Sequence, residues 1–579
     1  MFHSKLKKQI IMKNILKLFF LSGILALTSC DDFLDKTPLD EVSEDAFYST
    51  PSDLQAAVNG WYNDLPGWSA TSIGYNILPD MYSDVGTAEE PSNRLSGLSY
   101  TVPTSATASV WSFDEVRETN WLLDHVDQAS GDQTLIDQYT GETYFFRAYF
   151  YFELLKRYGD VPIFPVYFDN LDDEYVYAAR DPRNEVADFI ISDLDTAISL
   201  MQSFTEVATS RVSKEAAQLL KARVALYEGT WEHYHSGTDF GVSGLDGSTF
   251  LQTAADAAED LMDSGVFSLY SDYKTLFNQT GYAGNSEVML WRDYNSIDLG
   301  INNVLQQTWP NRSGFTKFAI DSYLCIDGNP TAVSSLYQGN ENFATLEMNR
   351  DPRLAATIMA PGDLIEIKDD GTEEYWEYPD FGSTNSGLTG YESEKYRNVV
   401  YDENYDDYTE DTSRIIMRYA EALLIFAEAK AELGTITQGD LDKSINLLRA
   451  RVDMPDLNLA GIVTDPNWPN YGYTLTDILY EVRRERSVEL MAEGFRADDL
   501  YRWRAHALFD GDQPRGAYYY DGIVSTTLDE SDVTLDSDGF ILPFASTGNY
   551  NFDESKAYLN PLPTDELQLN PNLTQNPGW

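Results

Sequence analysis

The sequence predicts a mainly α-helical fold, made of tetratricopeptide-like helix pairs, a large loop-rich remainder and a few short strands. Several segments with apolar residues at helical spacing follow one another through short connections. Residues 270–412 interrupt them with a stretch rich in Gly, Asn, Tyr and Asp, in which the helical period fades. Apolar residues make up 43% of the 579-residue chain, which is enough for a large core and argues against a wholly disordered protein.

The N-terminus has the pattern of a lipoprotein export signal. Lys13 and Lys17 flank the start of an apolar run, residues 18–27, which is too short to span a bilayer and is typical of a signal-peptide core. The run leads through small residues to Cys30, an ending that resembles the bacterial lipobox, in which the cysteine carries lipid. We therefore expect export and lipidation at Cys30; an ordinary buried N-terminal helix is the alternative. The remaining cysteine, Cys325, then has no disulfide partner.

These features divide the chain into three parts. We expect a signal peptide at 1–29, for which Met12 is an alternative start, an acidic tether at 30–45 and a single folded unit at 46–579. Within that unit the helical scaffold is expected at 46–66, 111–265 and 413–505. Loop-rich binding portions are expected at 67–110, 270–412 and 506–579.

The first half of the unit contains helices with recognisable ends. Thr50 before Pro51 is an N-cap followed by a proline in the first turn, and the helix continues to Trp61. The strongest helical pattern covers 133–158 and stops at Gly159, a residue type that often ends helices. Other helices are predicted at 111–126, 184–200, 213–230 and 248–264.

The second half returns to helices after the loop-rich stretch. Helices are predicted at 415–433, 441–452, 475–491 and 495–503, and short strands at 288–291 and 364–368. Short connections suggest the helix pairs 133–158/184–200, 213–230/248–264 and 415–433/441–452, although no clean repeat consensus is present.

Charge and motifs restrict the function. The 94 acidic and 40 basic residues give a formal charge of −54, which repels nucleic acid and anionic polymers and favours a neutral ligand. Solubility in a salty habitat is a second explanation for the acidic charge.

The sequence contains no nucleophile elbow, HExxH motif or phosphate-binding glycine loop, but a glycosidase-type carboxylate pair stays open as a possibility. His233 and His235 are two apart, which places them on different helix faces, so we expect surface residues rather than a metal pair.

No cofactor is expected. Asp402, Asn404 and Asp406 resemble the start of a calcium loop, but Asp407 stands where glycine is needed and Ser413 where glutamate is needed. An EF-hand is therefore excluded, and a looser structural Ca²⁺ site is an alternative to solvated loop charge.

Aromatic residues in the loop-rich portions are the best candidates for ligand contact, because Trp and Tyr faces stack on sugar rings. Trp309 lies in a mostly polar run with Gln307, Asn311 and Arg312, which is unlike a core position. Further candidates are Trp68, Tyr75, Trp291 and Tyr294. Packing in the protein interior is the competing interpretation for each of them.

Several stretches together resemble the SusD/RagB family, the surface glycan-binding lipoproteins of Bacteroidetes. In chain order they are CDDFLDKTP, RAYFYFELLKRYGDVPIF, DFIISDLDTAI, KEAAQLLKARVALYEG, RYAEALLIFAEAKAELG, INLLRARVDMP, ERSVELMAEGFRADDLYRW and YLNPLPTDELQLNPNLTQNPGW. The resemblance implies a non-enzymatic glycan binder at the cell surface that serves as the lid of a SusC-like TonB-dependent outer-membrane transporter. It implies structural roles for the motif residues Arg147, Tyr158, Gly159, Arg496 and Trp503. The pair Asp31-Asp32 resembles the family's signal for display on the cell exterior.

The prediction is thus a non-catalytic lipoprotein that captures a neutral glycan, for example a β-glucan or mannan, and passes it to the transporter. A lipid-anchored glycoside hydrolase is the first alternative, and a convergent Asp/Glu pair in the main cleft would favour it. A peptide-capturing relative is the second, and a cleft without a coplanar aromatic platform would favour that version.

Overall fold

The structure is a computed structural model. It describes residues 48–68, 78–88, 90–98, 100–108, 110–170, 174–295, 299, 313–368, 370–377, 379, 388–397, 399, 411–520 and 533–579.

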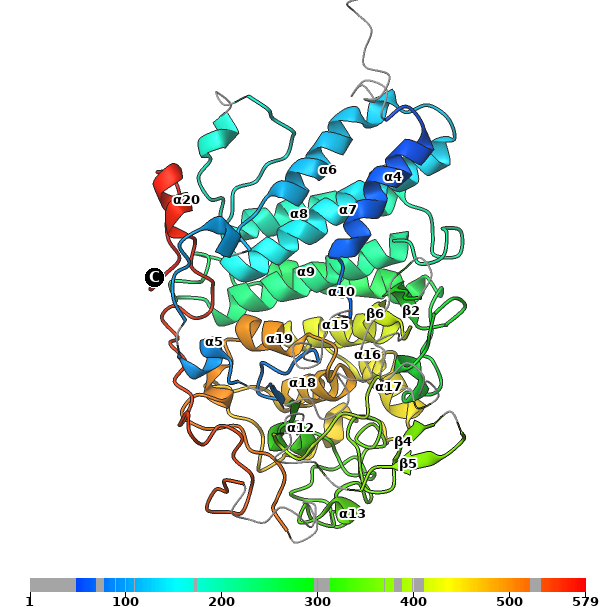
Figure 1. Cartoon of the computed structure of the whole chain (residues 1–579), viewed down its shortest axis with the longest axis vertical. Helices are drawn as coiled ribbons and strands as arrows, with labels where there is room; N and C mark the ends of the chain where they lie inside the picture. Colours follow the sequence, from blue (N-terminus) through cyan, green and yellow to red (C-terminus); the bar gives the residue numbers. More distant parts are fainter. Residues whose placement is uncertain are drawn as a thin grey trace, which may run out of the picture.

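Helices of the first half form the upper part of the molecule in Figure 1. Helices α7 to α10 stack in chain order, each against the next, and α10 packs on α15 of the second half. Helices α4 and α6 cover α7 on its outer side. This arrangement confirms the first two predicted helix pairs. The helices are α4 (Pro51–Trp61), α6 (Asp114–His125), α7 (Gln133–Tyr158), α8 (Arg183–Leu200), α9 (Lys214–Tyr234) and α10 (Ser248–Asp263).

Helices of the second half lie below this stack (Figure 1). Helix α15 packs mainly on α10 and α18 and contacts α17 through fewer residues, so the third predicted pair is looser than the first two. The predicted helix 441–452 is divided into α16 and α17, which are separated at Lys443 and Ser444. The helices are α15 (Tyr419–Glu432), α16 (Gln438–Asp442), α17 (Ile445–Arg451), α18 (Asp477–Glu489) and α19 (Arg496–Arg502).

Two of the three short antiparallel strand pairs join segments that are far apart in the chain. The prediction of a helix from residue 415 was wrong at its start, because Arg414–Arg418 forms strand β6. The backbone of β6 pairs with that of β2 in a two-stranded antiparallel ladder. This pairing between segments more than 120 residues apart overrides the local apolar pattern. The pairs are β1 (Gly86–Thr87) with β3 (Gly314–Phe315), β2 (Val288–Arg292) with β6, and β4 (Leu364–Ile367) with β5 (Glu373–Tyr375).

The remaining helices are short and lie outside the helical stack. The α-helices are α5 (Asn93–Ser96), α12 (Lys317–Asp321), α13 (Phe343–Leu346) and α20 (Thr564–Leu569). The 3₁₀ helices are η1 (Tyr62–Asp64), η2 (Ala106–Ala108), η3 (Val126–Gln128), η4 (Glu174–Tyr177), η5 (Thr275–Phe277), η6 (Leu459–Gly461) and η7 (His506–Leu508).

The buried apolar residues form two clusters. The larger cluster fills the helical stack and extends into α15, α17 and the C-terminal segment. The second cluster lies within the irregular lower part of the molecule in Figure 1 and contains residues from Trp68 to Ile541. Val488 and Met491, at the end of α18, belong to this second cluster. Helix α18 therefore connects the helical stack to the loop-rich portion.

Residues of the family-like motifs have structural positions. Arg147 is 4% exposed, and its guanidinium forms two hydrogen bonds with Asp193, at 2.7 and 2.6 Å. This burial and pairing agree with the structural role that the family resemblance implies for Arg147. Gly159 ends α7 with φ +70°, and a Cβ there would lie 2.9 Å from Leu559. Trp503 is fully buried.

The prediction that His233 and His235 at the end of α9 both lie at the surface was wrong for one of them. His233 is exposed, whereas His235 is 0% exposed. His235 stacks on Trp231, and the C-terminal segment supplies Tyr558 against its ring. A distant segment therefore covers a position that local spacing places at the surface.

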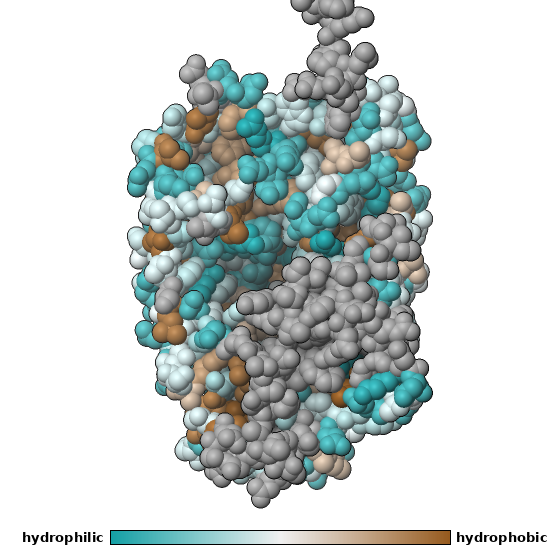
Figure 2. All heavy atoms as spheres, viewed as in Figure 1, coloured by the Kyte–Doolittle hydropathy of each residue, from teal (hydrophilic) through white to brown (hydrophobic). Residues whose placement is uncertain are grey.

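A bilayer-spanning helix requires a long apolar run, and a metal site requires clustered ligand side chains. None of the helices described is long and apolar enough to cross a bilayer. Figure 2 shows hydrophilic residues over much of the described part of one face, with hydrophobic residues in separate small groups. Among the described residues, no group of three or more His, Cys, Asp or Glu side chains is placed to hold a metal ion.

Candidate functional site

A cleft between α12 and α18 gathers aromatic and polar side chains from distant parts of the chain; we call it the α12–α18 cleft. Its volume is about 360 Å³, within the range of roughly 300–1,000 Å³ that is typical of small-molecule sites. One wall comes from α12 and residues 331–340, and the other from residues 465–471 and α18. Its lining includes Phe318, Asp321, Tyr337, Asn340, Asp465, Trp468, Tyr471, Tyr480, Arg483, Arg484 and Ser487.

Two parallel aromatic rings stand on the α18 wall. The rings of Trp468 and Tyr480 are stacked, with centroids 4.5 Å apart and planes within 5°. Both side chains are half-buried. The indole N–H of Trp468 donates to Glu481 Oε1 at 3.3 Å, which fixes the ring in its plane. The cleft thus has a pre-oriented aromatic platform, the kind of surface that binds a sugar ring or another flat apolar face.

The charged groups of the cleft are neutralised by the protein itself. Arg484 Nη2 lies 2.7 Å from Asp465 Oδ2, and Lys317 pairs with Asp321. Deeper in the wall, Arg483 is bound to Glu432 and Arg496 to Asp84. Among the described lining residues a ligand therefore meets paired charges, which bind hydroxyl groups well but offer no free cation for an acid group.

The cleft tyrosines supply neutral hydroxyl groups. Burial raises the pKa of Tyr337 to about 12, and burial also raises the pKa of Tyr471. Both side chains therefore keep their protons at neutral pH. Each can donate a hydrogen bond to a ligand oxygen and accept one in return.

Three polar atoms on the cleft wall have no hydrogen-bond partner among the described residues, and one of them, Arg484 Nε, lies 3.3 Å from Glu481 Oε1 in an ion pair. The other two are Nε of Arg483 and Oγ of Ser487, which lie one helical turn apart on α18. Arg483 is 1% exposed. A buried donor without a partner costs about 1–3 kcal/mol, so these atoms favour a ligand that brings acceptors.

Two other cavities fit a ligand less well. The groove between α4 and α6 is larger, about 660 Å³, but Trp61 Nε1 already donates to Glu118 and Arg117 to Tyr167. A cavity between α7, α9 and α19 has a volume of only about 140 Å³, which suits waters better than a sugar. The α12–α18 cleft is therefore the candidate site.

Comparison with known proteins identifies the family. The family model described as "SusD family" matches residues 273–579, which include the whole cleft. The chain belongs to the SusD family. A second family model, described as "Starch-binding associating with outer membrane", matches residues 32–226.

Curated relatives and solved structures agree with this assignment. "SusD-like protein P2" of Formosa agariphila is 24% identical over 97% of this chain and 99% of its own length. "SusD-like protein P38" of the same organism is 24% identical over 85% and 91%. A SusD-like carbohydrate-binding protein of Bacteroides fragilis superposes with a TM-score of 0.70 at 22% identity, covering 91% of this chain and 100% of that one. Another SusD-like protein of that species gives 0.69 at 25% identity, covering 94% and 100%.

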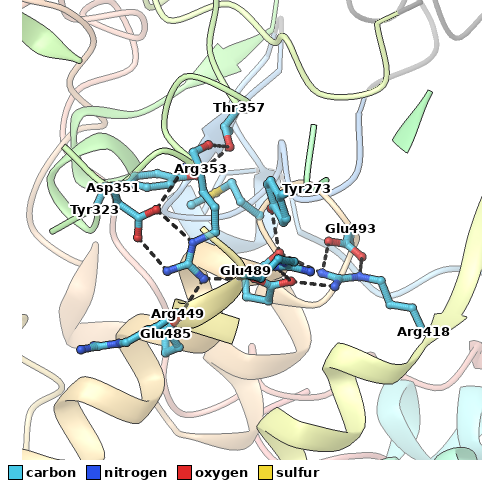
Figure 3. A network of polar contacts seen from close by, with 12 residues as sticks. Tyr273, Tyr323, Asp351, Arg353, Thr357, Arg418, Arg449, Glu485, Glu489 and Glu493 are labelled. Carbon is cyan, nitrogen blue, oxygen red and sulfur yellow. Dashed lines mark hydrogen bonds and ion pairs between the residues drawn. The ribbon is translucent and has the colours of Figure 1, made fainter. Parts of the chain in front are cut away.

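A buried ion-pair network holds the opposite face of α18 in this SusD-family chain (Figure 3). Glu489 lies 3.0 Å from Arg353, 2.7 Å from Arg418 and 2.6 Å from Arg451. Glu485 bonds Arg353 at 2.7 Å and Arg449 at 2.9 Å. Although burial opposes ionisation, the surrounding guanidinium groups hold the pKa of Glu489 well below its usual range.

The network fixes the cleft wall from behind. Arg353 comes from the loop-rich portion, where Asp351 also binds it at 2.7 Å, and Arg418 ends β6. Helix α18 thus presents residues 480, 483, 484 and 487 to the cleft and residues 485 and 489 to the network. A cleft wall anchored by charged pairs on its far side keeps its geometry without ligand.

Three of the aromatic residues predicted from the sequence are described, and all three are buried in the second core cluster. Trp68 is 6% exposed, Trp291 3% and Tyr294 5%. The hydroxyl of Tyr294 accepts the backbone N–H of Trp68 at 2.5 Å, and Trp291 Nε1 donates to Asp293 at 2.6 Å. The structure brings Trp68 and Tyr294 together, outside the lining of the α12–α18 cleft.

The other predicted site residues lie outside the described ranges. They are Tyr75, Gln307, Trp309, Asn311 and Arg312, together with the lipidation residue Cys30 and the acidic loop at 402–406.

The platform residues Trp468 and Tyr480 are not among the residues predicted from the sequence. Trp468 occurs in TDPNWPNYGY, a polar run of the same kind as the one around Trp309. That signal was present and would have placed Trp468 among the candidates. Nothing local marks Tyr480, because its neighbours follow an ordinary helical pattern and only the folded chain brings it under the indole.

Proposed function

We propose that this SusD-family protein is a non-catalytic, cell-surface glycan-binding lipoprotein that captures a neutral oligo- or polysaccharide, such as a β-glucan or mannan. The observation that carries the proposal is the stacked, half-buried pair Trp468 and Tyr480 beside the unpartnered donors of Arg483 and Ser487. An aromatic face flanked by hydrogen-bonding groups is what a sugar ring requires.

The charge pattern supports a neutral ligand and no catalysis. Each carboxylate of the cleft, Asp321 and Asp465, is held by its own cation. A glycosidase needs one carboxyl group free to donate a proton and a second free to attack or to activate water. The formal charge of −54 adds long-range repulsion of anionic polymers.

The pre-oriented aromatic pair also favours glycan over peptide, although its two rings stack face to face and are not coplanar. A peptide-binding cleft would profit from an exposed strand edge or from pockets for alternate side chains. The α12–α18 cleft instead offers parallel rings from one wall, together with hydroxyl and paired ionic groups.

The proposed place of action is the exterior face of the outer membrane. Lipid on Cys30 would anchor the protein, residues 30–45 would serve as its tether, and bound glycan would pass to a SusC-like TonB-dependent transporter. The family model described as "Starch-binding associating with outer membrane" supports this location.

Replacing the platform tests the proposal. We expect Trp468→Ala to weaken binding of a neutral β-glucan or mannan by about tenfold or more, measured by isothermal titration, because a central aromatic contact is typically worth more than about 1.4 kcal/mol. Trp121→Ala is the matched control, since Trp121 is also half-buried but lines the groove between α4 and α6. It should leave glycan affinity unchanged.

Other outcomes would change the assignment. Tight binding of alginate without binding of neutral glycans would refute the charge argument, and release of reducing sugar by the pure protein would make it a hydrolase.

Affinity-gel migration of the Trp309→Ala variant tests the sequence-based candidate separately. We propose that this change also weakens retention, and unchanged migration would remove Trp309 from the site.

A further inference from the structure

A second cavity adjoins the α12–α18 cleft at α12. Its volume is about 300 Å³, and it lies between α12 and residues 508–515. Lys317, Phe318 and Asp321 line both spaces. Because the same three side chains of one short helix border both cavities, the two are neighbouring chambers that meet at α12.

The second chamber has the same mixture of chemistry as the first. Phe318, Phe509 and Tyr550 supply rings, while Ser83, Asp512 and Gln513 supply polar groups. Gln513 uses its Nε2 to donate to Asn549 Oδ1 at 3.3 Å, but its Oε1 is buried without a partner among the described residues. This acceptor matches a ligand hydroxyl, as the unpartnered donors of the first chamber match ligand oxygens.

The ridge between the chambers is held firmly in place. The backbone N–H of Lys317 donates to the carbonyl of Arg515 at 2.7 Å. Thr316 caps α12 at Ala319 and donates its hydroxyl to the carbonyl of Asp84 at 2.6 Å. A ridge tied to both neighbouring segments offers a fixed path across its top, along which the paired Lys317 and Asp321 present polar groups.

We propose, resting on the glycan-binding function above, that the site takes an extended chain of sugars, with one stretch in the α12–α18 cleft and the next in this second chamber. A short oligosaccharide fills one chamber only. A longer chain crosses α12 and occupies both, so that its second stretch binds without a further loss of overall rotation and translation. The ligand class is therefore a linear glycan long enough to cross α12.

The test is isothermal titration of the full chain with laminari-oligosaccharides and manno-oligosaccharides, from the disaccharide to the octasaccharide. We expect the wild-type affinity for the bound series to rise about tenfold or more with length and then to level off once both chambers are filled. Gln513→Ala should lose most of this gain while keeping the affinity for the shortest ligand that binds. That retained affinity also shows that the variant is folded.

Gln252→Ala is the matched control, because Gln252 is exposed on α10 and lines neither chamber. It should follow the wild type at every length. Affinity that does not depend on length, or a Gln513→Ala variant that keeps the full gain, would overturn the two-chamber site and leave the proposed function intact. A wild-type protein that binds neither series at any length would overturn both.

Discussion

His235 illustrates what burial does to a single titratable side chain in this protein. The imidazole is 0% exposed, stacks on Trp231 with centroids 4.1 Å apart, and shares a hydrogen bond of 2.9 Å with the carbonyl of Tyr501. A carbonyl only accepts, so Nε2 carries the proton. Burial lowers the pKa of His235 to about 3, and the folded protein therefore keeps this side chain neutral.

This side chain should make folding stability sensitive to acid. Its pKa is lower in the folded than in the unfolded chain, so its stabilising effect is present above pH 6.5 and is lost as the pH falls toward 3. Between pH 7 and pH 5 we expect His235 to account for a loss of about 2 kcal/mol in the free energy of unfolding, at about 1.4 kcal/mol per pH unit.

Urea unfolding at pH 7 and pH 5 measures this effect. His235→Gln, which can keep the donor to Tyr501, should show a smaller pH dependence than the wild type. His233→Gln, on the exposed face of the same helix, should retain the wild-type dependence. Equal pH dependence in all three proteins would contradict the assignment.

At the scale of elements, helix α18 both lines the candidate site and takes part in the buried ion-pair network. One face carries Tyr480, Arg483 and Ser487 into the cleft, and the other places Glu485 and Glu489 among buried arginines (Figure 3). A buried charge is tolerated only when it is paired, so the network has little room for change. The helix that shapes the candidate site is thus held by contacts on the far side from any ligand.

Removing one central charge of the network should lower the stability of the folded protein. We expect Glu489→Gln to lower the free energy of unfolding by about 3–5 kcal/mol, because Arg353, Arg418 and Arg451 would lose a shared buried partner. Glu554→Gln is the control, since Glu554 is 54% exposed in its pair with Arg504 and should change stability by less than about 1 kcal/mol. Denaturant unfolding of the two variants gives the comparison, and similar losses in both would contradict it.

On the scale of the whole molecule, a stack of helices supports an irregular portion that supplies one wall of the site. The stack runs from α7 through α10 to α15, and the loop-rich portion has its own core cluster (Figure 1). The whole chain carries a formal charge of −54. Self-repulsion of such a charge opposes the compact state and weakens when salt screens it.

Stability should therefore rise with ionic strength. We expect the Tm to increase when NaCl is raised from about 10 mM to about 150 mM, since the Debye length falls from about 30 to about 8 Å over that range. Sucrose at matching osmolarity is the control and should raise the Tm less. A Tm that is constant or falls with NaCl would show that local ion pairs outweigh the net charge.

The sequence determined the features that depend on local periodicity and on charge. Helices α7 to α10 follow from apolar spacing, and the end of α7 at Gly159 follows from the residue type that commonly ends helices. These interpretations hold because each rests on residues within one or two turns of each other. Short motifs in order likewise indicated the SusD family, which the family model over residues 273–579 then established.

The tertiary structure alone decided which side chains meet. Strand β6 replaced the start of a predicted helix because β2 pairs with it, and His235 became buried because the C-terminal segment covers it. The candidate site also forms only through tertiary packing, because its residues Phe318, Trp468 and Tyr480 are separated in the sequence by a dozen to more than a hundred residues. Periodicity gives the face on which a side chain lies within its own element, but only the packing of elements decides what that face meets.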